Sequence, residues 1–138
     1  MIDSQILNYL ERNSLCVFTV IQEDGSLHSA TCKYASTQAA EIIIHTKNTT
    51  RKVQNLLDGK SANASVVVGV TDQEWISWQA TGTARVALKR EADMQDLYER
   101  RYSVGFPIDS DSVFIIFSPI WYRYTEFKSD PKVIIESQ

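Results

Sequence analysis

Residues 45 to 57 read HTKNTTRKVQNLL and join an apolar run to a helical pattern. The run is three consecutive isoleucines at 42–44, which is typical of a buried strand. After the basic residues, apolar side chains recur with the spacing of one helix face: Val53, Leu56 and Leu57. The stretch therefore predicts a strand over 41–46 followed by a short helix over 50–57, which ends near Gly59.

The basic residues of this stretch stand where the helix is expected to begin. Lys47, Arg51 and Lys52 alternate with threonines, although the chain as a whole is mildly acidic. A helix N-terminus presents unpaired N–H groups and the positive end of the helix dipole, so it favours anions. The guanidinium of Arg51 can also bind two oxygens at once. Two interpretations stay open at this point: a phosphate site, or a capped helix with solvated bases.

Composition limits what else the chain can be. Its 138 residues predict one domain, 1–138, and 43% hydrophobic with 22% charged residues is ordinary for a globular protein. A formal net charge of −3 argues against a nucleic-acid partner. The longest apolar runs, such as 113–117, are too short to span a bilayer. Acidic residues near the N-terminus argue against an export signal, so we expect a cytoplasmic protein without membrane association.

The remaining pattern is mostly that of strands. Helices are expected near 2–10, with Asp3 or Ser4 as N-cap, over 50–57 and over 91–101. Strands are expected over these ranges: 15–21, 27–35, 41–46, 65–70, 75–88, 113–118 and 121–127. Gly82 predicts a bend or bulge in the longest strand, and Pro119 predicts a break between the last two strands. About seven strands in hairpin order indicate an antiparallel barrel, since closure hides strand edges.

Two cysteines flank a predicted hairpin turn at 23–26. If Asp24 and Gly25 form a two-residue turn, Cys16 faces Lys33 while Cys32 faces Val17. The thiols then lie on opposite faces of the ribbon, and no disulfide is expected, as in a reducing cytoplasm. A three-residue turn would shift this parity.

Metal and catalytic signals are weak in this sequence. His28 and His45 are the only histidines, and neither has a second ligand at metal spacing, so no metal site is expected. His45 either contacts a ligand beside the basic cluster or packs structurally. In the strand 121–124, Trp121 and Arg123 share one face and two tyrosines the other, which suits a subunit interface or a ligand rim.

Over roughly residues 5 to 128, the order of these features resembles the FMN-binding split-barrel family typified by pyridoxamine 5′-phosphate oxidase. In that family an aromatic–Thr pair ends a strand, a Ser-Arg-Lys triplet begins the next helix, and together they hold the flavin phosphate. At the same spacing this chain has His45-Thr46 and then Thr50-Arg51-Lys52. The resemblance therefore implies that these five residues bind the phosphate of FMN.

Three further segments support the resemblance. Residues 29–33 look like the family's second strand, whose backbone runs along the flavin ring, which implies contacts from Ala30, Thr31, Cys32 and Lys33. Residues 63–69 are similar to the strand that follows the phosphate helix. Residues 79–84 read QATGTA and resemble the family's Gln-x-x-Gly-x-Ala strand, which implies that Gln79 approaches the flavin.

The resemblance implies a mainly β fold, an antiparallel, Greek-key-like split β-barrel with a few short α-helices. It also implies a homodimer with FMN sites at the interface. The expected function is that of an FMN-dependent oxidoreductase acting on a small cytoplasmic substrate. A non-catalytic flavin-binding sensor or carrier is the alternative, and a haem or deazaflavin binder on the same fold is a third possibility.

The C-terminal part departs from the pyridoxamine phosphate oxidases. Their Arg-x-His is absent from 121–127, and no histidine follows residue 45, so the standard oxidase reaction is not expected. Residues 98–107 look closer to a small single-domain subgroup of unassigned reaction. Tyr98 and Arg101 lie about one helical turn apart and, with Arg123, are candidates for a substrate opening. A helix packed on the barrel with exposed arginines is the alternative.

Overall fold

The structure is a computed structural model that describes residues 1–88, 90–102 and 111–138. Its helices are α1 (Ser4–Arg12), the 3₁₀ helix η1 (Arg51–Gly59) and α2 (Ala92–Arg101). Its strands are β1 (Leu15–Ile21), β2 (Leu27–Lys33), β3 (Ala35–Ser36), β4 (Ile42–Lys47), β5 (Ser61–Val68), β6 (Ile76–Val86), β7 (Ser112–Glu126) and β8 (Val133–Glu136).

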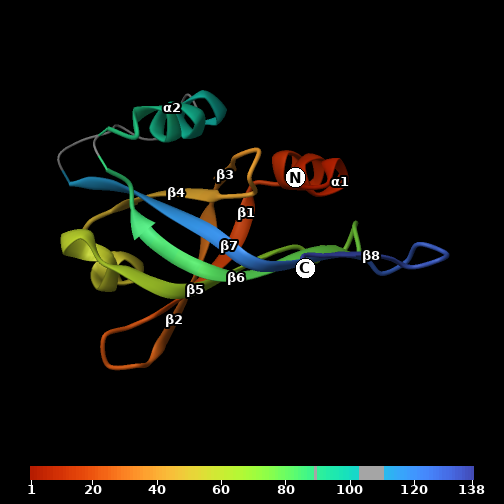
Figure 1. The fold of residues 1–138 in the computed structure, drawn as a ribbon, viewed down its shortest axis with the longest axis horizontal. Coiled ribbons are helices and arrows are strands. Elements are labelled where there is room, and N and C mark those ends of the chain that lie inside the picture. Colours follow the sequence, from red (N-terminus) through yellow and green to blue (C-terminus); the bar gives the residue numbers. More distant parts are fainter. Residues whose placement is uncertain (89, 103–110) are drawn as a thin grey trace.

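The eight strands found in the described residues belong to one antiparallel sheet. The strand order is β2-β1-β5-β6-β7-β4-β3, and β8 pairs with β7. The sheet curls into an open half-barrel, with α1 and α2 above it and η1 at the left end in Figure 1. The expected mainly β split barrel with short helices is confirmed.

The isoleucine run of β4 is buried on both faces of the sheet. Ile42 and Ile44 belong to the main core, with strands β1, β5, β6 and β7. Ile43 points the other way, into a second cluster with Tyr98 of α2 and Phe114 of β7. A strand covered on both faces needs consecutive apolar residues, which explains why this part of the sequence does not alternate.

The N-terminal helix closes one end of the core. Asp3 is the N-cap, and its carboxylate accepts a hydrogen bond of 2.8 Å from the backbone N–H of Gln5. Ile6, Tyr9 and Leu10 are buried on one face of α1. The Tyr9 hydroxyl also donates to the Ile76 carbonyl at 2.9 Å, which attaches α1 to β6.

The predicted register of the first hairpin is wrong. The turn has three residues: the backbone N–H of Gln22 donates to the Ser26 carbonyl at 2.7 Å, and Gly25 has φ +87°. The Asp24 carboxylate stabilises this geometry by accepting from the Ser26 N–H at 2.9 Å. Cys16 is therefore the direct partner of Cys32, on the same face, and both are buried free thiols.

The predicted break at Pro119 is also wrong, because β7 continues through it. Pro119 pairs with Gly82 at a register shift between Thr81 and Gly82, so the expected irregularity at Gly82 is confirmed. A Cβ on Gly82 would lie 2.0 Å from the Ser118 carbonyl oxygen, so only glycine permits this close approach. A bulge leaves a residue outside the regular ladder of hydrogen bonds, so a residue without an N–H can be accommodated there. The strand can therefore continue through Pro119.

Some further features of the structure differ from the predictions. The middle helix is 3₁₀ rather than α, with non-helical angles at Leu57 and Asp58. The strand expected over 65–70 begins at 61, and the short strand β8 was not predicted.

Candidate functional site

The end of β4 and the start of η1 are held together by two threonines. The Thr46 and Thr50 hydroxyl oxygens lie 2.9 Å apart, and the Thr50 hydroxyl donates to the Lys47 carbonyl at 2.9 Å. Thr50 occupies the N-cap position, yet its side chain makes no capping hydrogen bond. The first N–H groups of η1 therefore lack the side-chain acceptor that normally satisfies them.

The two cations that follow have no partner within the described ranges. Arg51 is exposed and Lys52 is partly exposed, and neither makes a hydrogen bond or ion pair with a described residue. Burial raises the pKa of Cys32, and the nearby Lys52 ammonium opposes this shift. Lys52 thus lies toward β2. Hydrogen bonds from Ser26 lower the pKa of Asp24, and the Arg51 guanidinium adds a smaller attraction without forming an ion pair with that carboxylate.

His45 is packed among aromatic rings. Its imidazole lies 4.8 Å from the ring of Phe114 and 5.9 Å from that of Tyr98, centroid to centroid. These contacts hold the end of β4 against α2 and β7.

Strand β2 lies at the edge of the sheet, beside η1. It pairs only with β1 among the described strands, so its other edge carries backbone N–H and C=O groups without ladder partners there. Ala30 and Cys32 face the core side, whereas Thr31 and Lys33 face the outer side. An open edge of this kind can bond a planar ligand with donors and acceptors on its rim.

Gln79 belongs to the outer face of the sheet. Directly paired residues share a face, and one such row crosses six strands: Thr31, Val17, Val67, Gln79, Arg123 and Glu136. Arg123 pairs with Glu136 at 3.1 Å within this row. The predicted cofactor residues therefore form two groups in one chain, one around η1 and the core side of β2, the other on the outer face.

The side chains predicted to line a substrate opening have contacts within the chain. Tyr98 is only 3% exposed, and burial raises its pKa to about 12. Arg101 donates to the carbonyls of Glu11, at 2.8 Å, and of Asn13. Its guanidinium also lies 5.4 Å from the ring centroids of Tyr34 and of Tyr102. These contacts fit the alternative of a packed helix; residues 103–107 of the segment 98–107 lie outside the described residues.

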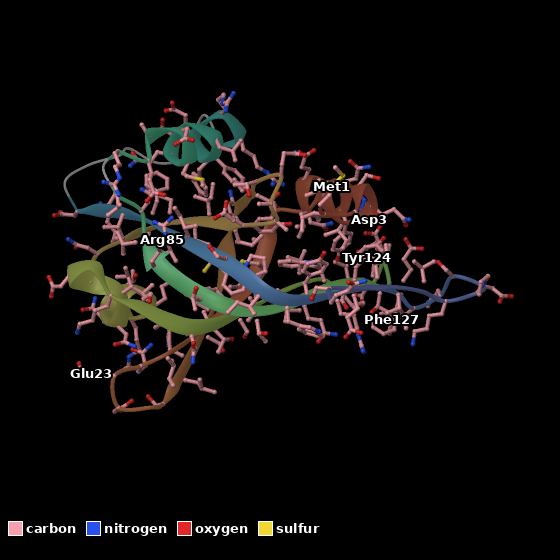
Figure 2. The ribbon with its side chains drawn as sticks, in the orientation of Figure 1. Met1, Asp3, Glu23, Arg85, Tyr124 and Phe127 are labelled. Atoms are coloured by element: carbon pink, nitrogen blue, oxygen red, sulfur yellow. The ribbon has the colours of Figure 1, made fainter. Side chains whose placement is uncertain are left out.

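A cavity that the sequence did not reveal adjoins the start of η1. It has a volume of about 370 Å³ and lies between η1 and the turn joining β1 to β2, where Figure 2 labels Glu23. Its lining residues are Gln22, Glu23, Asp24, Ser26, Leu27, His28, Arg51, Gln54 and Asn55. Of the predicted site residues, only Arg51 lines it. In the sequence, the spacing of Arg51, Gln54 and Asn55 along the helix was the one pattern that could have indicated this cavity.

Other kinds of site find little support in the described part of the chain. It contains no group of three residues able to hold a metal ion and no helix long and apolar enough to cross a membrane. Burial raises the pKa of both Cys16 and Cys32, which keeps these thiols protonated and unreactive at neutral pH.

Neither a family model nor a curated protein matches this sequence. Solved structures do match. A pyridoxamine 5′-phosphate oxidase-related, FMN-binding protein from Nostoc punctiforme has 11% identity and a TM-score of 0.67, over 95% of this chain and 86% of that chain. General Stress Protein 26 from Bacillus anthracis has 15% identity and a TM-score of 0.69, over 97% of each chain. An FAD-binding protein from Mycobacterium smegmatis has 17% identity and a TM-score of 0.65, over 92% and 98%.

The fold is the split barrel of these proteins. Identities this low show the fold alone, and within a shared fold the function depends on the site.

Proposed function

We propose that this split barrel binds FMN, with the flavin phosphate at the start of η1 and the ring along β2. The observation that carries the proposal is the pair of unpartnered cations, Arg51 and Lys52, beside uncapped N–H groups. The solved relatives described as binding FMN or FAD support a flavin as the ligand.

The residues at this place fit the chemistry of a flavin phosphate. A phosphate dianion needs fixed donors and positive charge, and Arg51, Lys52 and the first N–H groups of η1 offer both. The Thr50 hydroxyl proton is directed at the Lys47 carbonyl, so the charged groups carry most of the phosphate binding. Small side chains on the core side of β2, Ala30 and Cys32, leave room for a flat ring near the open strand edge.

When bound, FMN supplies electron transfer to and from a small substrate, here one in the cytoplasm. The chain's own residues bind the phosphate, orient the ring and limit access of water. The absence of the Arg-x-His pattern argues against the standard pyridoxamine phosphate oxidase reaction, so we propose a different oxidoreductase.

A flavin-binding module without catalysis is the second candidate. The observation that favours it is the chemistry of the thiol nearest Lys52: the raised pKa of Cys32 keeps it protonated at neutral pH. A general acid or base works best with a pKa near the operating pH. A protein that only stores or senses flavin needs no such group.

Visible spectroscopy separates these functions. Flavin-free protein should turn yellow with FMN, and anaerobic NADH or NADPH should bleach it reversibly in air if it is an oxidoreductase. A yellow protein indifferent to both reductants supports the binding module. A protein that takes up no flavin contradicts the proposal, and a haem or deazaflavin binder would show a different absorption band.

We also propose a homodimer, joined through the outer face of β1 and β5. Val17 and Val67 are direct partners there and are 42% and 37% exposed, while Leu15 and Val70 nearby are 54% and 43% exposed. Gln79 lies in the same row, so it would face the second copy across this interface. Exposed apolar patches of this kind are typical of interfaces.

Sedimentation tests the assembly. The protein should have about twice the chain mass of 15.7 kDa. Val67→Glu should produce monomers that bind FMN weakly, whereas Ile134→Glu, at an exposed apolar position on β8, should leave the dimer intact. A wild-type monomer that binds FMN tightly would contradict the shared site.

A further inference from the structure

Strand β8 leaves one edge of the sheet open, at the end of the molecule away from α2 in Figure 1. Among the described strands, β8 pairs only with β7. An open edge presents backbone N–H and C=O groups that can bond another strand. We propose that β8 pairs antiparallel with β8 of a second copy of this chain, which makes the two sheets continuous across a twofold axis. This contact involves neither the proposed flavin site nor the outer face of β1 and β5, so it can join two of the proposed dimers.

The direction of the backbone decides which residues of β8 can take part. The N–H of Ser137 donates to the Tyr122 carbonyl at 2.9 Å, so Ser137 is directed at β7. Residues of an antiparallel strand alternate between the two edges, and therefore Ile135 is also directed at β7. The N–H and C=O groups of Ile134 and Glu136 then point to the open edge. A second β8 can thus bond only through the even-numbered residues of both strands.

One of the registers that this alternation allows matches the side chains of the two strands. It places Ile134 opposite Ile134 of the second copy, at the twofold axis, and Lys132 opposite Glu136 of the second copy. These three side chains share one face because they are two residues apart, and all three are exposed, Ile134 to 52%. Apolar and oppositely charged pairs that lie directly opposite each other stabilise a sheet. A shift of the register by two residues would place Ile134 opposite a charged residue instead.

The charges beside β8 fit this register. Within one chain, Arg123 Nη2 lies 3.1 Å from the Glu136 carboxylate. Lys132 Nζ lies 5.1 Å from the centroid of the Phe127 ring and makes no ion pair with a described residue. Across the contact, each Glu136 would lie between its own Arg123 and Lys132 of the other chain, so that cation, anion and cation alternate. A lysine at a strand edge normally discourages pairing, but here the same strand carries the matching acid, which favours a second copy as the partner.

Sedimentation equilibrium over a range of protein concentrations tests the inference. Two strands of four residues make few contacts, so we expect weak association, with a Kd on the order of 0.1 mM. The mean mass should rise toward twice its dilute value between about 5 µM and about 1 mM protein. The dilute value, one chain or two, reports the proposed dimer separately. A mass that stays constant over the whole range would overturn this inference and leave the dimer and the flavin site untouched.

Charge reversal tests the register. Lys132→Glu would place acids opposite each other at the contact, and Glu136→Lys would place lysines there, so neither variant should associate alone. An equimolar mixture of the two variants restores opposite charges and should associate like wild type. Lys128→Glu, which reverses an exposed lysine in the turn before β8, is the matched control and should associate like wild type. Association of Lys132→Glu alone, or failure of the mixture while wild type associates, would overturn the proposed pairing of β8.

Discussion

Two short helices of this protein each carry a pair of basic residues, and the surroundings of the two pairs differ. Arg51 and Lys52 begin η1 and have no hydrogen bond or ion pair with any residue that the structure describes. Arg100 and Arg101 end α2, where Arg101 donates to two carbonyls at the end of α1 and lies against two tyrosine rings.

The position of each pair along its helix explains the difference. Cations at a helix C-terminus are stabilised by the helix dipole, so Arg101 needs no ligand to account for it. Cations at a helix N-terminus oppose the dipole, at a cost of about 0.3–1 kcal/mol each. A bound anion reverses this repulsion, which makes Arg51 and Lys52 the pair that indicates a ligand.

The largest expected effect is on flavin affinity. Arg51→Ala should weaken FMN binding by about 1.5–3 kcal/mol, the range for a hydrogen bond to a charged group, and leave the melting temperature unchanged. Fluorescence titration measures the affinity. Lys60→Ala, an exposed cation just after η1, is the matched control and should bind FMN like wild type. Unchanged affinity in Arg51→Ala would remove Arg51 from the phosphate site and end the contrast between the two helices.

The second effect should appear in stability and not in affinity. Arg101→Ala removes the donor to the carbonyls of Glu11 and Asn13, and it should lower the free energy of unfolding by about 1–2 kcal/mol. Urea denaturation measures this loss. Arg100→Ala is the control, since Arg100 is exposed and, among the described residues, reaches only the Asp96 carbonyl of its own helix, at 3.4 Å. A loss of FMN affinity in folded Arg101→Ala would show that α2 also takes part in binding.

The two helices also show what a sequence can reveal about a site. The cations of η1 could be recognised as a candidate anion site because that prediction depends on local features: a strand end, a helix start and the residues between them. The partners of Arg101 are carbonyls 88 and 90 residues away, and no local pattern indicates such contacts. The cavity beside Arg51 was hidden for the same reason, because its second wall is a turn far from η1 in sequence.

The fold was predictable where periodicity decides it. Strand β1 matches its predicted range of 15–21, and consecutive isoleucines marked β4 as a strand. The register of the first hairpin was not predictable. A single extra turn residue at Asp24–Gly25 changes which side chains share a face. The row that joins Thr31 to Gln79 depends on several such registers, so the split of the site residues between two faces became visible only in the structure.

The smallest effect concerns pH and the start of α2. The Glu91 carboxylate accepts from the two terminal nitrogens of Arg85, Nη1 and Nη2, at 2.6 and 2.8 Å, and from the Leu88 N–H at 2.8 Å. The hydrogen bonds from Arg85 lower the pKa of Glu91 to about 2, below its ordinary 4.5. Because the folded pKa is the lower one, this stabilisation is present above pH 4.5 and is lost as the pH falls toward 2.

Glu91→Gln should therefore reduce the free energy of unfolding at pH 7 by less than about 1 kcal/mol, since the pair is partly exposed. The difference from wild type should shrink between pH 4.5 and 2, where the wild-type carboxylate becomes protonated. Denaturation curves at a series of pH values measure the difference in free energy of unfolding between Glu91→Gln and wild type. The other titrating carboxylates are the same in both proteins, so their contributions cancel in this difference. FMN affinity at pH 7 should not change, because α2 is attached internally at both ends, by Arg85 and by Arg101. A pH-independent difference would mean that Glu91 acts through packing and not through its charge.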